Sequence, residues 1–188
     1  MLDNNQVHVI VDIETDRPVA GLHSMLSIGA VASIQDREMG EFYQKLLPIK
    51  EAGQDTGTME WWSKHPEAWQ EVTADAHPAD EVIKGFYAWV ASLGATPVFV
   101  ASPIVFDYSF VHWCLHHFIG NNPFEDYSGV QRTLDLASFT AGKLNIPLSR
   151  ARRSQLANKY KEGMPQHSHK AIDDARGYGV LLRNILNS

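Results

Sequence analysis

The chain has 188 residues and a formal net charge of −6, with 44% hydrophobic and 20% charged residues. These values are typical of one soluble globular domain spanning 1–188, and the negative charge argues against a protein that coats long nucleic acids by charge alone. The sequence has no apolar run long enough to cross a bilayer, no secretory leader and only one cysteine, Cys114, so we expect a cytoplasmic protein with no membrane partner and no intrachain disulfide.

The first half of the chain predicts strands followed by helices. Short runs that are apolar or alternate in polarity predict strands over residues 7–14, 27–33 and 41–47. A polar, Gly-rich loop over 50–58 then leads to Trp61 and Trp62. Helices are predicted over 66–72 and 78–93, the second from its apolar periodicity and from Pro78 at its start.

The second half alternates strand and helix. We expect a strand over 97–101, helices over 106–118, 134–144 and 170–186, and a basic stretch over 149–161. Early strands that later mix with helices predict the α/β class, with a mixed central β-sheet flanked by α-helices.

Two carboxylates stand at the end of the first predicted strand. Asp12 and Glu14, one residue apart, follow a β-branched apolar run typical of a buried strand. Side chains alternate between the faces of a strand, so both carboxylates point to one face, where they repel. A divalent cation relieves this repulsion because hard cations prefer carboxylate oxygens. The alternative is a solvated strand end with two acids facing water.

Asp107 and Asp174 are further acids near the starts of predicted helices. Ala171 and Ala175, four residues apart, permit a close approach of the last helix to the sheet beside Asp174. His169 precedes Asp174 by five residues and is expected just before this helix. For both acids, compensation of the helix dipole is a sufficient alternative explanation.

The motifs resemble those of a known nuclease family. Asp12-x-Glu14, Asp107 and His169-x-Ala171-x-x-Asp174-Ala175 resemble, in order and spacing, the DEDD family of 3′-to-5′ exonucleases, which have an RNase H-like fold. The histidine five residues before the final aspartate resembles the histidine (DEDDh) subclass, since Lys170 stands where the other subclass has tyrosine. The resemblance runs from about residue 7 to residue 186.

Shorter segments resemble a phage and bacterial branch that includes the T4 exonuclease A type and a mycobacterial exoribonuclease type. The segments read Ser27-Ile28-Gly29-Ala30-Val31, Phe42-Tyr43 and Thr58-x-x-Trp61-Trp62. The sequence departs from the proofreading pattern after Thr15, where Asp16-Arg17-Pro18 replaces the common Thr-Gly.

The resemblance implies a function. The expected enzyme hydrolyses phosphodiester bonds from the 3′ end of single-stranded DNA or RNA and releases 5′-mononucleotides, with two divalent cations, Mg²⁺ or Mn²⁺, as cofactors. By the resemblance, Asp12 bridges both cations. Glu14 and Asp174 hold the one that binds the attacking water, and Asp107 supports the second. His169 accepts the proton of the water, because imidazole titrates near neutral pH.

Other residues are candidates for substrate contacts, each with packing in the core as its alternative. They are Thr15, His23, Met25, Trp61, Trp62, Phe106 and Phe110. The two tryptophans could stack on a terminal base, and we favour one inside the core and one at the site. The histidine and the methionine stand in the loop after the first strand, where they could close over the scissile nucleotide. The two phenylalanines flank Asp107.

The basic stretch over 149–161 could guide a phosphate backbone, with a solvated basic face as the alternative. Its cationic residues are Arg150, Arg152, Arg153, Lys159 and Lys161.

A zinc site is a rival interpretation. His112 and His116 are four residues apart on a predicted helix, with His117 beside them, and helical histidines at this spacing can share a metal. A His-Glu-x-x-His hydrolase needs a glutamate after the first histidine, and Trp113 stands there. The sequence therefore disfavours a zinc enzyme.

Two further functions stay open. One is a non-catalytic RNase H-like module that binds nucleic acid, which the presence of all four acids and the histidine disfavours. The other is a phosphodiesterase acting on very short oligonucleotides, which the acidic net charge permits. The sequence does not decide between DNA and RNA, and a homodimer is one alternative for the oligomeric state.

Overall fold

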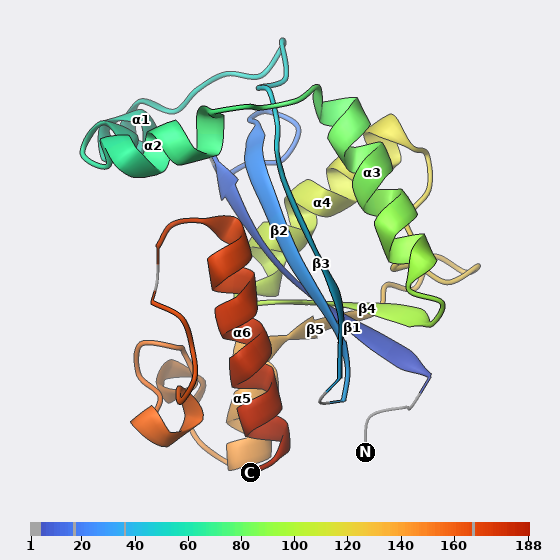
Figure 1. Cartoon of the computed structure of the whole chain (residues 1–188), viewed down its shortest axis with the longest axis vertical. Helices are drawn as coiled ribbons and strands as arrows, with labels where there is room; N and C mark the ends of the chain where they lie inside the picture. Colours follow the sequence, from blue (N-terminus) through green and yellow to red (C-terminus); the bar gives the residue numbers. More distant parts are fainter. Residues whose placement is uncertain (1–4, 17, 36, 167) are drawn as a thin grey trace.

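The fold is built on a five-stranded mixed β-sheet (Figure 1). The computed structural model of the chain describes residues 5–16, 18–35, 37–166 and 168–188. The strands, in the sheet order β3-β2-β1-β4-β5, are β1 Gln6–Thr15, β2 Met25–Ile34, β3 Arg37–Lys45, β4 Thr96–Ala101 and β5 Thr133–Asp135. β1 pairs antiparallel with β2 and parallel with β4, so it is the central strand.

Helices cover both faces of the sheet, as the α/β prediction requires (Figure 1). α3 (Ala79–Ser92) and α4 (Ile104–Phe118) pack on one face, and α5 (Leu136–Leu144) and α6 (Ala171–Leu186) pack on the other. α1 (Thr56–Ser63) and α2 (Pro66–Thr73) lie at one end of the sheet. None of the helices in the described part of the chain is long and apolar enough to cross a membrane.

The central strand is buried on both faces, and its alternation places the functional side chains. Val9 and Val11 pack in the core formed with α3 and α4, whereas Ile10 packs in the core formed with α5 and α6. Asp12 and Glu14 continue the series of Ile10, so they project toward α6.

The structure confirms the predicted strands and helices with shifted ends. It adds α1, β5 and two 3-10 helices, η1 Leu148–Arg150 and η2 Asn158–Tyr160. α1 begins at Thr56, inside the predicted loop, because the Asp55 carboxylate accepts a hydrogen bond from the Thr58 amide at 2.9 Å and caps the helix. β5 has three residues paired with β4, too few for a visible periodicity. β3 begins at Arg37, four residues before the predicted start at Glu41.

A glycine sets the distance between α6 and the sheet. Gly29 on β2 lies against the first turn of α6, where a Cβ on this residue would stand 2.3 Å from the backbone carbon of Ala171. Only a residue without a side chain permits this approach, and Ala171 supplies the small partner that the sequence predicts. The contact brings Asp174 to the edge of β1.

We expect Gly29→Ala to lower the free energy of unfolding by about 3 kcal/mol or more, because the clash is with backbone that cannot change rotamer. Chemical denaturation measures the loss. Gly179→Ala is the matched control. Gly179 lies on α6, and nothing stands within 4 Å of a Cβ added there. The control should gain about 0.5–1 kcal/mol from its better helix propensity. Equal stability of the two variants would contradict the close-approach argument.

Candidate active site

Three carboxylates meet where α6 crosses the end of β1. Asp12 and Glu14 share one face of β1, and Asp174 comes from the first turn of α6 with 1% exposure. One carboxylate oxygen from each of the three lies within 4.8 Å of those of the other two. The structure thus brings together three of the four acids singled out in the sequence.

Asp107 approaches the same strand end from α4. Its carboxylate is 4% exposed and accepts a hydrogen bond from the Ile13 amide, between Asp12 and Glu14, at 3.2 Å. It stands outside the cluster of three. The opposite face of the sheet therefore contributes the fourth acid, held by the backbone of β1.

Burial raises the pKa values of Glu14, Asp107 and Asp12, and nearby carboxylates add to the shift for Glu14 and Asp12. Burial is the main cause for Glu14, whose pKa rises to about 8, and nearby Asp174 and Asp107 add to it. Burial raises the pKa of Asp107 to about 7, and burial together with the neighbouring carboxylates raises the pKa of Asp12 well above its usual range. Such a group of hard oxygen donors fits divalent cations, which would hold all the carboxylates ionised.

His169 lies just before α6, the helix that carries Asp174, as the sequence predicts. Its backbone is in the left-handed region, with φ 55°, and Lys170 separates it from the start of α6. Non-glycine residues adopt this conformation rarely and often at functional sites. The edge of its ring meets Trp61 of α1, with the ring centroids 5.0 Å apart.

Residues 7–186 match the model of the Rv2179c-like domain, described as a 3′-5′ exoribonuclease domain. The chain belongs to this family of 3′-5′ exonucleases.

Individual proteins similar to this Rv2179c-like domain agree with the assignment. It is 30% identical over 192 residues to the 3′-5′ DNA exonuclease Cap18 of Escherichia coli, covering 98% of this chain and 94% of the relative. The nuclease domain of 3′hExo, a DEDDh family member bound to rAMP, has a TM-score of 0.69 at 12% identity, covering 97% of this chain and 92% of that chain. The zinc-bound ExoI–ssDNA complex of E. coli has a TM-score of 0.65 at 14% identity, covering 97% of this chain and 40% of that one. The predicted RNase H-like exonuclease fold is confirmed.

The two tryptophans of the Rv2179c-like domain are divided between core and surface, as we favoured. Trp62 is 2% exposed, and its indole N–H donates to the Thr15 carbonyl at 3.1 Å. Trp61 is 36% exposed and stacks on His65, with the ring centroids 4.1 Å apart. Of the two tryptophans, Trp61 is the one whose ring contacts His169.

Other substrate-contact candidates are also buried, which agrees with their packing alternative. Thr15, at the end of β1, is 8% exposed. Met25 is the first residue of β2 rather than part of the loop, and its side chain is buried in the core. His23 is buried in the loop, with Nδ1 3.1 Å from the Val19 carbonyl oxygen. Phe110 is a core residue, and Phe106 is the half-buried member of that pair. Arg17, in the segment Asp16-Arg17-Pro18 that departs from the proofreading pattern, lies outside the described residues.

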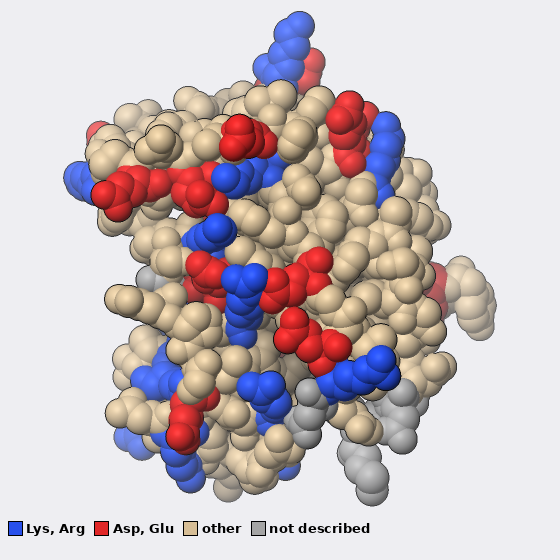
Figure 2. Space-filling model, viewed as in Figure 1, with Lys and Arg blue, Asp and Glu red and all other residues tan. Residues whose placement is uncertain are grey.

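Arg153 is the site residue that sequence reasoning did not single out. Its guanidinium donates to the Asp174 carboxylate at 2.7 Å. Figure 2 shows the Lys and Arg side chains that gather over the segment between α5 and α6, from which Arg153 comes. In the sequence Arg153 is one of several cations in that stretch, and no spacing distinguishes it.

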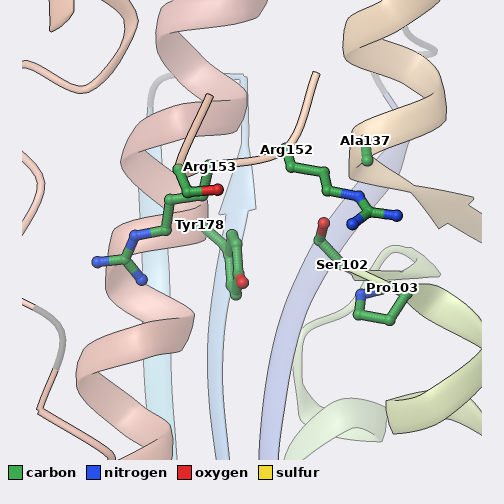
Figure 3. Close-up of a pocket in the computed structure, with 7 residues that line it drawn as sticks. Ser102, Pro103, Ala137, Arg152, Arg153 and Tyr178 are labelled. Atoms are coloured by element: carbon green, nitrogen blue, oxygen red, sulfur yellow. The ribbon is translucent and has the colours of Figure 1, made fainter. Parts of the chain in front are cut away.

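A cavity of about 650 Å³ opens beside this ion pair. Arg152, Arg153 and Tyr178 line it, with Ser102 and Pro103 at the end of β4. In Figure 3 the two arginine side chains leave the chain in opposite directions, Arg152 toward α5 and Arg153 toward α6. The cavity is thus lined both by Arg153, the partner of Asp174, and by the exposed Arg152.

The raised pKa values predict how metal binding depends on pH. The pKa of Glu14, ordinarily 4.5, is about 8 in the folded chain, so its contribution to the stability of the metal-free fold is present below about pH 4.5 and is lost as the pH rises through 8. Cations bind the ionised carboxylates and oppose this loss. We therefore expect the increase in Tm on adding Mg²⁺ to grow between pH 5 and pH 8, by calorimetry.

Glu14→Gln, which cannot ionise, is the control and should flatten this pH dependence. An increase in Tm that is the same at every pH would contradict the coupling between the carboxylate protons and the cation.

Proposed function

We propose that this 3′-5′ exonuclease depends on divalent cations, Mg²⁺ or Mn²⁺, and removes 5′-mononucleotides from the 3′ end of single-stranded DNA or RNA. The observation that carries the proposal is the meeting of three carboxylates within 4.8 Å of one another, with His169 five residues before one of them, Asp174. Buried carboxylates at this density repel unless cations neutralise them.

In this proposal the four acids are the cation ligands. Asp12, Glu14, Asp107 and Asp174 would hold two cations, which when bound supply the positive charge that stabilises the phosphorane-like transition state and the leaving 3′ oxygen. The charges of Asp107, Glu14 and Asp174 all act on Asp12, which supports its expected role as the ligand shared by both cations. The Ile13 amide orients Asp107 from the other side of the strand.

His169 would accept the proton of the attacking water. The left-handed backbone at this residue, the edge contact of its ring with Trp61 and its place just before the helix of Asp174 support this role. A ring placed there reaches a water at the cluster without replacing a carboxylate ligand. Positioned acid–base groups contribute roughly 10²–10⁴-fold to a rate.

Residues around the rim would bind the strand. The exposed ring of Trp61 and the half-buried ring of Phe106 would meet the terminal base, and the buried Thr15, His23 and Met25 are further candidates. Arg152 and Arg153 line the cavity beside Asp174, where their charges attract the phosphate backbone despite the acidic net charge. Aromatic stacking and local cations are the common means of holding a single strand.

Trp61→Ala should weaken binding of a 3′-terminal nucleotide by about 1–3 kcal/mol, roughly 5- to 150-fold in Kd, because the stacking surface is lost. Fluorescence anisotropy with a short oligonucleotide in Ca²⁺, which supports binding without turnover, measures the change. Trp61→Phe should retain most of the affinity. An unchanged Kd in Trp61→Ala would remove this residue from the substrate site.

Digestion of matched DNA and RNA oligonucleotides tests the proposal. Strands labelled at the 5′ end should shorten one nucleotide at a time in Mg²⁺ or Mn²⁺ and remain intact in EDTA. A 3′-phosphate should block the reaction and a closed circular strand should resist it. Cleavage of the circle at the rate of the linear strand would show an endonuclease and contradict the proposal.

The same reactions separate the alternatives. A phosphodiesterase for very short substrates would digest dinucleotides and leave longer strands intact, so substrates of graded length are included. A non-catalytic module would bind all of them and cut none. The DNA and RNA series decide the sugar preference, because the matching family is described as exoribonuclease and Cap18 as a DNA exonuclease.

A further inference from the structure

A second group of metal-ligating side chains lies on α4, away from the carboxylate cluster. His112 and His116, four residues apart on this helix, have ring centroids 4.5 Å apart. The structure brings Glu125 to them from the loop that follows α4. Its Oε1 stands 3.2 Å from Nδ1 of His112 and 3.3 Å from Nε2 of His116. The three ligand atoms lie within 4.8 Å of one another.

These separations match those around a tetrahedral zinc ion. With Zn–N and Zn–O bonds of about 2.0–2.2 Å, two ligand atoms of a tetrahedron stand about 3.3–3.5 Å apart. Both distances from Glu125 to the histidine nitrogens are close to this value. Two imidazoles and one carboxylate form a donor set that suits Zn²⁺, and a water completes such a site.

The glutamate is held in place by the loop around it. The Asn122 side chain is buried, and its amide donates to Oε1 of Glu125 at 3.3 Å. The backbone of Glu125 donates to the Asn122 carbonyl, and its own carbonyl accepts from the Arg132 guanidinium at 2.9 Å. A ligand fixed by hydrogen bonds from outside the first coordination shell is typical of a metal site.

The cluster is separate from the carboxylates of the active site. Nine residues of helix separate His116 from Asp107, a rise of about 13 Å with a rotation of about 180°. The histidines therefore face away from Asp107, and an ion bound there cannot take part in the exonuclease reaction directly.

We propose that His112, His116 and Glu125 form a zinc site that fastens the loop over residues 120–132 to α4. The sequence offered only the pair of histidines, because the third ligand comes from a loop whose path it does not predict. An ion pair between Glu125 and protonated imidazoles would use the same contacts without a metal, and the experiment distinguishes the two.

Zinc binding to the full chain should be measured by elemental analysis after dialysis against Zn²⁺ with excess Mg²⁺. His116→Ala and Glu125→Gln should each bind about one equivalent less than the wild type. His117→Ala is the matched control, since this neighbouring exposed histidine stacks on Trp113 outside the cluster. It should bind as the wild type does.

Hydrogen exchange locates the ion. Zn²⁺ should slow amide exchange over residues 120–132 at least about tenfold in the wild type and in Asp12→Asn, and should leave exchange unchanged in His116→Ala. Loss of the zinc equivalent in Asp12→Asn but not in His116→Ala would assign the ion to the carboxylates. Absence of zinc binding in the wild type would leave only an ion pair. Either result overturns the proposal.

Discussion

Asp12→Asn should lower the single-turnover rate by about 10³-fold or more, because a shared ligand is lost and the cations stabilise the transition state by several kcal/mol. Burial raises the pKa of Asp12, and the charges of Asp107, Glu14 and Asp174 raise it further. Neutralising it relieves the repulsion, so the metal-free variant should be at least as stable as the wild type. The expected result is therefore a folded, stable protein that binds metal weakly and does not cut.

Asp173→Asn is the matched control for this prediction. Asp173 is adjacent to Asp174 in the first turn of α6, but its carboxylate pairs with Arg176 at 2.9 Å and is not one of the clustered acids. It should keep a rate close to that of the wild type. If the two variants lose similar activity, the effect comes from removing any acid near the site rather than from losing a cation ligand.

His169→Ala should lower the rate by roughly 10²–10⁴-fold while metal affinity changes little, because the ring would accept a proton and not ligate. Asp174→Ala should instead lower both, since a carboxylate is lost from the cluster. Calorimetric titration with Mn²⁺ and single-turnover rates across pH measure the two quantities. The acidic limb of the pH–rate profile should disappear in His169→Ala.

Two outcomes would contradict the role of His169 as the proton acceptor. If His169→Ala loses metal as severely as Asp174→Ala, the histidine is a ligand. If it keeps the wild-type rate, another group accepts the proton. His65, whose ring lies 5.7 Å from that of His169, is then the nearest described candidate. His167, close in sequence, lies outside the described residues.

Local alternation and helix periodicity predicted the frame of this fold. Asp12 and Glu14 could be placed on one face because a strand leaves no other choice, and Asp174 could be placed near the sheet because Ala171 is small. Loop paths decide the rest. Arg153 and Glu125 reach their partners from segments without periodicity, so nothing local distinguishes them from other charges on the surface.

The short helix α1 shows a second reason for incomplete prediction. Its sequence contains Gly57 and begins in a polar segment, so propensity favours a loop, yet the cap from Asp55 and the burial of Trp62 stabilise a helix. Tertiary packing thus decides the position of Trp61, and with it the contact to His169.

The ion pair between Arg153 and Asp174 affects how the enzyme responds to a low concentration of divalent cations. A guanidinium cannot diffuse away, so the chain carries a permanent cation against the buried Asp174 carboxylate. Loss of the exchangeable cations should then silence the enzyme while the fold persists. When divalent cations are added back, activity should return as fast as they bind, because the chain does not need to refold. The cation concentration would thus control the activity reversibly.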